Sequence, residues 1–105
     1  QDPGELTMTK IADLPNFDMA EHLNTDEDVA AYLSLVLEED DPSELAHALG
    51  VIARTRGMSE IASASGLTRE ALYKALRPGS QPRFDTICRV CGALGVRLVA
   101  QPIRT

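Results

Sequence analysis

The sequence predicts an all-α fold of five to six helices, followed by one short C-terminal β-strand. Three observations lead to this prediction: apolar residues recur at helical spacing, capping residues stand where those stretches begin, and glycines stand where several of them end. The 105 residues are enough for one domain, and 44% hydrophobic with 25% charged residues is typical of a globular protein. Such a length excludes a Rossmann or TIM-barrel enzyme.

The first half of the chain contains the signals of three helices. A capping box at its start predicts a short helical turn over residues 18–23. Thr25 caps a longer helix, expected over about 26–39, whose apolar residues form one buried stripe. Asp41 and the proline after it begin the next helix, which we expect over about 42–56.

The second half predicts three further helices and a strand. We expect a short helix over 58–65, a second one that Thr68 caps and that ends near residue 77, and a third over about 84–94. Residues 96–102 alternate in polarity and predict one strand. Because a lone strand needs a partner, a second copy of the chain or another protein would have to supply one.

Residues 58–77 (MSEIASASGLTREALYKALR) have the spacing of a helix-turn-helix. Ala62 is a small residue at the position where two short helices cross steeply, and Gly66 tolerates the positive φ that the turn requires. Leu67 follows the glycine and is expected to pack inward between the two helices. A helical hairpin packed for structural reasons alone is the alternative explanation of this pattern.

The outward side of the second short helix carries the residues expected to bind DNA. In a helix-turn-helix, the N-terminal residues of this helix meet base edges in the major groove. Arg69 is the candidate for a bidentate contact to guanine, and the residues around the helix end are expected to contact phosphates. The full set of expected DNA contacts is Ser59, Thr68, Arg69, Glu70, Tyr73, Lys74, Arg77, Ser80 and Arg83.

Charge is divided unevenly along the chain. Residues 1–50 contain one lysine and thirteen acidic residues, a net charge of −12, whereas residues 51–105 contain nine basic and three acidic residues, a net charge of +6. The formal total of −6 therefore does not exclude nucleic acid as a partner. The asymmetry predicts two surfaces with two different partners.

Four blocks stand in a specific order along the chain: 13–18 (DLPNFD), 28–33 (DVAAYL), 66–76 (GLTREALYKAL) and 82–86 (PRFDT). In this combination the sequence resembles the HigA-like addiction-module antidote proteins, which are antitoxins of bacterial type II toxin–antitoxin pairs. Its helix-turn-helix resembles the Cro/C1-type DNA-binding domains. The resemblance covers nearly all of residues 8–103, and it departs from the usual pattern at Cys88 and Cys91, where aliphatic residues are commoner.

The resemblance implies an antitoxin that neutralises a basic RelE/ParE-superfamily (HigB-like) ribonuclease toxin. It also implies a homodimer that represses its own operon by binding a palindromic operator. An acidic segment can cover the positive surface of an RNA-cleaving toxin, and apolar anchors would add buried contacts. The expected toxin contacts are Asp13, Leu14, Phe17, Asp18, Glu21, Leu23, Asp26, Glu27 and Asp28. The alternative is that this segment packs on its own core.

The chain accordingly divides into four segments. Residues 1–7 resemble translated vector or tag sequence. Met8, which follows them, resembles a natural start. Residues 8–41 are expected to form the acidic toxin-binding segment and helix. We expect residues 42–95 to form the helix-turn-helix DNA-binding domain, and 96–105 to form the strand and tail.

The cysteines and histidines do not form the complete pattern of another class of function. Cys88 and Cys91 form a CxxC pair, but with Phe84 they stand at core-facing helical spacing and lack a second Cys or His pair. His22 and His47 are isolated from any nucleophile or metal-ligand pattern. We therefore expect no enzyme, no metal and no cofactor.

Two further hypotheses compete with the antitoxin. The first is a free-standing phage-type Cro/C1 transcriptional repressor without a toxin partner, and the second is a protein-interaction module without salt-dependent DNA binding. The paucity of cysteines and the absence of a signal peptide predict a cytoplasmic protein. No apolar run approaches the roughly 18 residues of a membrane span, so we expect no membrane partner.

Overall fold

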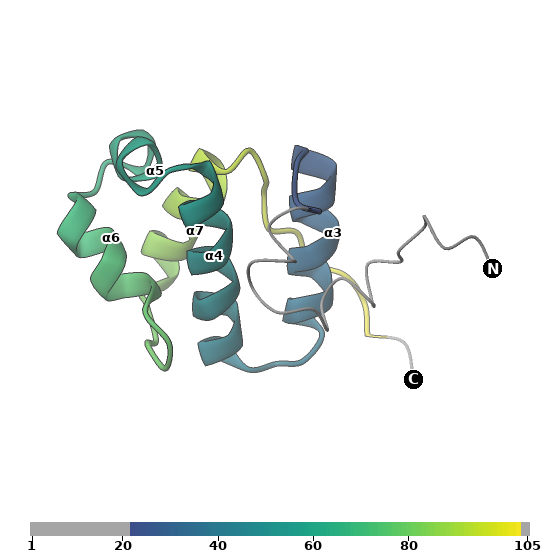
Figure 1. The fold of residues 1–105 in the computed structure, drawn as a ribbon. Helices are drawn as coiled ribbons and strands as arrows, with labels where there is room; N and C mark the ends of the chain where they lie inside the picture. The colour runs from purple at the N-terminus through teal and green to yellow at the C-terminus, as the bar shows by residue number, and fades with distance from the viewer. Residues whose placement is uncertain (1–21, 104–105) are drawn as a thin grey trace.

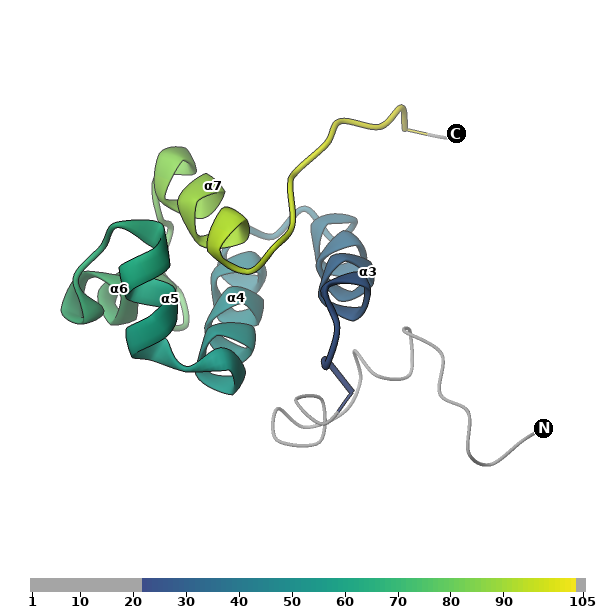
Figure 2. The ribbon, with the colours of Figure 1, turned by 90° about the horizontal axis from the view of Figure 1, so that it is seen from above.

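The computed structural model describes residues 22–103, and the described part of the chain is helical. Its helices are α3 (Asp26–Leu37), α4 (Pro42–Arg56), α5 (Met58–Ser65), α6 (Arg69–Leu76) and α7 (Phe84–Ala93). The two ribbon views show α4 in the middle, with α3 on one side and α5 and α6 on the other (Figures 1 and 2). The prediction of an all-α fold is confirmed for these residues.

The first two described helices begin at the predicted caps. The Thr25 hydroxyl accepts a hydrogen bond from the backbone N–H of Asp28 at 3.1 Å, and the Asp28 carboxylate accepts one from the backbone N–H of Thr25 at 3.3 Å. The Asp41 carboxylate accepts from the backbone N–H of Ser43 at 3.0 Å. The first of these helices ends at residue 37, earlier than predicted, where the chain turns and Asp40 adopts a φ of +55°.

The hydrophobic core has α4 at its centre. Leu49 and Ile52 are fully buried, and they belong to the same cluster as Val29 of α3, Leu72 of α6 and Val90 of α7. Full burial of a side chain of this size contributes about 1.5–3 kcal/mol. The core therefore joins α6 to both the preceding and the following helices.

A close approach between α4 and α6 occurs at Gly50. A Cβ atom placed on Gly50 would lie 3.0 Å from the backbone oxygen of Leu76, the last residue of α6. The hydrogen atoms of glycine let the end of α6 lie directly against α4. The sequence does not predict this contact, because it joins residues that are distant along the chain.

The turn between α5 and α6 has the predicted left-handed glycine. Gly66 adopts a φ of +75°, and its N–H donates to the carbonyl of Ser63 at 3.2 Å. The N–H of Leu67 donates to the carbonyl of Ala62 at 2.9 Å, which completes a Schellman motif. Leu67 then packs against the core as predicted.

The predicted C-terminal strand is not present in the described part of the chain. Residues 96–103 have no regular secondary structure and lead away from the end of α7 (Figure 2). Val96 and Leu98 pack against the core, whereas Val99 and Ile103 are exposed. A strand requires a hydrogen-bonded neighbour, and the described part of a single chain, being helical, offers none.

The inward face of α7 differs from the prediction. Phe84 is 70% exposed and Cys88 is exposed, so the assignment of these two residues to the core was wrong. Val90 and Cys91 are the buried residues of this helix, because α7 contacts the core on one side only. Burial, with a smaller contribution from the charge of Cys88, raises the pKa of the Cys91 thiol to about 11.

We expect Gly66→Ala to lower the free energy of unfolding by about 1–2 kcal/mol, because an L residue is strained in the left-handed conformation. Gly92→Ala is the matched control: Gly92 is helical in α7, and an added Cβ has no neighbour within 4 Å. This control should instead stabilise by about 0.5–1 kcal/mol. Urea denaturation followed by circular dichroism measures both, and a Gly66→Ala variant as stable as wild type would contradict the predicted strain.

Candidate nucleic-acid interface

The predicted helix-turn-helix corresponds to α5 and α6, which lie together at the end of the molecule away from α3 (Figure 1). Ile61 and Ala62 of α5 and Leu72 and Leu76 of α6 are all buried. Ala62, the small residue expected where the two helices cross, is among these buried residues. The rest of α6, apart from the partly buried Ala75, is exposed.

The first turn of α6 is ordered by its cap. The Thr68 hydroxyl accepts a hydrogen bond from the backbone N–H of Ala71 at 3.0 Å, as is typical of an N-cap. This hydroxyl is already engaged by the helix, so the main role of Thr68 is to fix where α6 begins. Arg69 and Glu70 are consequently the first two helical residues, and both are exposed.

One pair of predicted DNA-contact residues is joined on the outer face of α6. The Arg69 guanidinium carbon lies 5.5 Å from the centre of the Tyr73 ring, and Nη2 of Arg69 donates a hydrogen bond to the Tyr73 hydroxyl at 3.3 Å. The i,i+4 spacing that brings them together is visible in the sequence. Both residues were predicted to contact DNA, but their contact with each other was not predicted.

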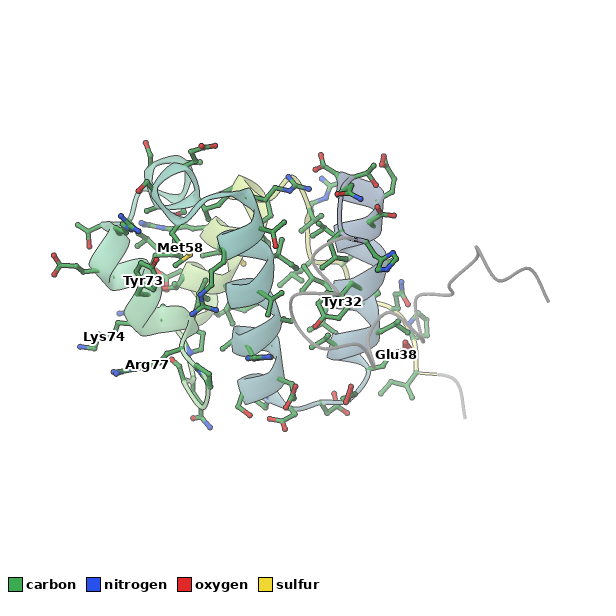
Figure 3. All side chains as sticks on the ribbon, viewed as in Figure 1. Tyr32, Glu38, Met58, Tyr73, Lys74 and Arg77 are labelled. Atoms are coloured by element: carbon green, nitrogen blue, oxygen red, sulfur yellow. The ribbon has the colours of Figure 1, made fainter. Side chains whose placement is uncertain are left out.

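Four other predicted residues lie around one hollow where α6 leads into α7. Lys74, Arg77, Ser80 and Arg83 all line this open hollow of about 530 Å³. Figure 3 shows the side chains of Lys74 and Arg77 pointing away from the body of the protein. Arg83 is paired with Asp85 at 3.3 Å, but both side chains are largely exposed, so water weakens this pair.

Ser59 lies apart from this group. It is exposed near the beginning of α5, and it is not among the residues that line the hollow. The helix begins after Gly57 without a side-chain cap. Its first backbone N–H groups therefore donate no hydrogen bond to a capping side chain.

The predicted toxin contacts fall into two groups. Asp13, Leu14, Phe17, Asp18 and Glu21 lie outside the described residues. Leu23 is only 1% exposed and belongs to the core, so its side chain offers no surface to a partner in this structure. The structure therefore corrects the expectation that Leu23 is an exposed apolar anchor, because the hydrophobic effect favours its burial against this chain's own helices.

Two of the remaining acidic residues have roles within the chain. Oδ1 of Asp26 lies 3.4 Å from Nη2 of Arg56, which joins the start of α3 to the end of α4. Asp28 closes the capping box of α3. Glu27 is exposed and has no such role among the contacts of the described residues.

A second acidic group lies at the turn between α3 and α4. Glu38, Glu39 and Asp40 are exposed. Hydrogen bonds from the side chain and backbone of Ser43 lower the pKa of Asp41, so this carboxyl keeps its negative charge at the start of α4. Figure 3 shows Glu38 on the side of the molecule opposite Lys74 and Arg77.

Neither a metal centre nor a membrane span is found in the described part of the chain. No group of three or more His, Cys, Asp or Glu side chains in residues 22–103 is arranged to hold a metal ion. The helices described above are too short or too polar to cross a membrane.

Comparison with known proteins gives a family match. A family described as "probable addiction module antidote protein" matches residues 13–102. A protein from Haemophilus influenzae strain Rd, described as an uncharacterized protein, is 44% identical over 91 residues, which are 87% of this chain and 94% of the relative. No solved structure gives a significant match. The family match includes all of the helices described here.

We expect Thr68→Ala to destabilise the protein by about 1 kcal/mol, because it removes the cap of α6. Ser59→Ala is the matched control, since Ser59 is also a hydroxyl residue near the beginning of a helix but provides no cap. Its free energy of unfolding should change by less than about 0.5 kcal/mol. Chemical denaturation measures the difference, and equal effects of the two substitutions would contradict a capping role for Thr68.

Proposed function

Because this chain belongs to the family of probable addiction module antidote proteins, we propose that it is the antitoxin of a type II toxin–antitoxin pair. A cognate toxin is its protein partner, and we propose that this toxin is a basic ribonuclease of the RelE/ParE superfamily (HigB-like). The chain acts by binding rather than by catalysis. Its second role is to repress its own operon.

The observation that carries the DNA-binding role is the outer surface of the helix-turn-helix. Arg69 and Tyr73 stand exposed on α6, and Lys74, Arg77 and Arg83 gather around the hollow beyond it. The first pair has the position of base-reading residues, and the second group that of phosphate contacts. Locally this surface is basic, although the whole chain has a net charge of −6.

Repression as a homodimer on a palindromic operator is the proposed arrangement. Two copies of α6 would then enter adjacent major grooves roughly 34 Å apart. The exposed Val99 and Ile103 support an interface that includes the C-terminal segment. Pairing between two such segments would supply the neighbour that the predicted strand lacks in one chain.

The acidic turn between α3 and α4 is the proposed electrostatic surface for the toxin. Glu38, Glu39 and Asp40 are exposed there, and Glu27 is exposed on α3. Because these side chains lie away from α6, toxin binding and DNA binding would use separate surfaces. Opposite charge would speed the encounter with a basic toxin.

The alternative is a free-standing Cro/C1-type repressor of the phage kind. It shares the helix-turn-helix and the dimer but has no toxin partner. The acidic residues of α3 and the following turn would then be solvated surface only. Capture of a small basic protein encoded beside the gene favours the antitoxin, and recovery of self-association alone from the native host favours the free-standing repressor.

For the DNA surface, we expect Arg69→Ala to lose sequence selectivity at a cost of about 1–3 kcal/mol. Lys74→Ala and Arg77→Ala should weaken binding evenly across sequences. Each should also reduce the slope of log K against log salt by about 0.9, because one phosphate contact is lost. Titration of DNA from upstream of its own gene at several salt concentrations measures these effects, and an unchanged footprint and affinity for Arg69→Ala would show that α6 is not the reading helix.

For the toxin surface, we expect a quadruple variant, Glu27→Gln with Glu38→Gln, Glu39→Gln and Asp40→Asn, to bind the toxin more slowly. The association rate at low salt should fall by about tenfold or more, because electrostatic steering is lost. The change avoids the acids that cap or pair within the chain, and asparagine tolerates the positive φ at position 40. Stopped-flow mixing with the cognate toxin measures this rate.

The control for this variant is Glu60→Gln, which removes an exposed acid from α5. It should leave toxin association unchanged, and the quadruple variant should keep its affinity for DNA. An unchanged association rate in the quadruple variant would overturn the proposed electrostatic surface.

A further inference from the structure

We propose that Tyr73 is a positioning residue that holds the Arg69 guanidinium in place to read a guanine base. This inference rests on the proposed DNA-binding function and names the base that one residue of α6 reads. It also separates the roles of two residues that the sequence places in one group. Arg69 touches the base, and Tyr73 acts through Arg69.

Two different interactions join the side chains of Arg69 and Tyr73. The guanidinium lies against the ring, with its central carbon 5.5 Å from the ring centre, and one N–H donates to the phenol oxygen at 3.3 Å. An arginine at the exposed beginning of a helix otherwise samples many rotamers. A cation–π contact combined with a hydrogen bond restricts this freedom before any DNA arrives.

The held guanidinium keeps the donors that guanine requires. Arginine carries five N–H donors, and the Tyr73 hydroxyl accepts from one of them. No ion pair joins Arg69 to a carboxylate of the described residues, so its other donors remain available. A guanine in the major groove presents two acceptors, O6 and N7, which match two parallel donors of an arginine.

The position of the pair on the helix agrees with this role. Arg69 is the first residue of α6, and Tyr73 follows one turn later with 38% of its surface exposed. The N-terminal residues of the second helix are those that meet base edges. Leu72, between them in sequence, is fully buried, which fixes the rotation of α6 and directs Arg69 and Tyr73 to the same outer face.

Each chemical component of the contact can be removed separately. Tyr73→Phe keeps the ring and deletes the hydrogen-bond acceptor, whereas Tyr73→Leu deletes both. Arg69→Lys keeps a positive charge that can lie on the ring but replaces the planar, rigidly paired donors of the guanidinium with a flexible ammonium group. Neither variant of Tyr73 removes a positive charge that could neutralise a phosphate.

The test is selection from a pool of randomised DNA duplexes by the purified full-length chain, followed by titration of the selected duplex and its single-base variants. Wild type should prefer guanine at one position of each half-site by about 5- to 140-fold, the equivalent of 1–3 kcal/mol. Tyr73→Phe should reduce this preference about 2- to 3-fold, and Tyr73→Leu about 3- to 5-fold. In both variants the slope of log K against log salt should equal that of wild type.

A double variant distinguishes positioning from an independent base contact. In the Arg69→Ala background, Tyr73→Leu should cause no further loss of preference at the guanine position, because the residue it positions is absent. A loss that adds to that of Arg69→Ala would overturn the inference. So would a Tyr73→Leu variant that is folded by circular dichroism and keeps the wild-type base preference.

Tyr32→Phe is the matched control, since it makes the same chemical change at the other tyrosine of the chain. Tyr32 is buried in α3, on the other side of the molecule from Tyr73 (Figure 3), and its replacement should leave the base preference unchanged. If wild type enriches no sequence from the pool, the DNA-binding function itself fails. If wild type enriches a sequence and the Tyr73 variants match it, only the positioning role fails.

Discussion

The hydrogen bond from the N–H of Leu67 to the carbonyl of Ala62 is the constraint on which the rest of the site depends. It closes α5 through the left-handed Gly66 and delivers Leu67 to the core, so that Thr68 can begin α6 immediately afterwards. The outer face of α6 is thus defined by backbone geometry before any charged side chain contributes. The basic residues of this face depend on a turn that contains none of them.

The features that the sequence predicted are those with local causes. The cap at Thr25, the positive φ at Gly66 and the cap at Thr68 each depend on residues within four positions of one another. The approach of Leu76 to Gly50 was not predictable in this way, because it brings together helices that are separated by α5. The exposure of Phe84 has a related cause, since helical spacing shows which residues share a face but not which face the core covers.

The sequence predicted which residues make up the candidate site, but not which of them contact one another. All nine residues expected to contact DNA lie in the described part of the chain, and four of them surround one hollow. The joining of Arg69 to Tyr73 depends on side-chain rotamers, which spacing alone does not fix. Burial of Leu23 likewise depends on how the chain enters α3, and no periodic pattern reports this.

The two cysteines of α7 differ in exposure, so the protein has one site for labelling with a thiol-reactive dye. Cys88 is exposed, whereas Cys91 is buried and its thiol has a pKa near 11, so at neutral pH only Cys88 offers an accessible sulfur. A maleimide dye would therefore attach to the unmodified chain at one place on α7. Fluorescence from that dye could report on the assembly of the chain with DNA or with another protein, without a single engineered residue.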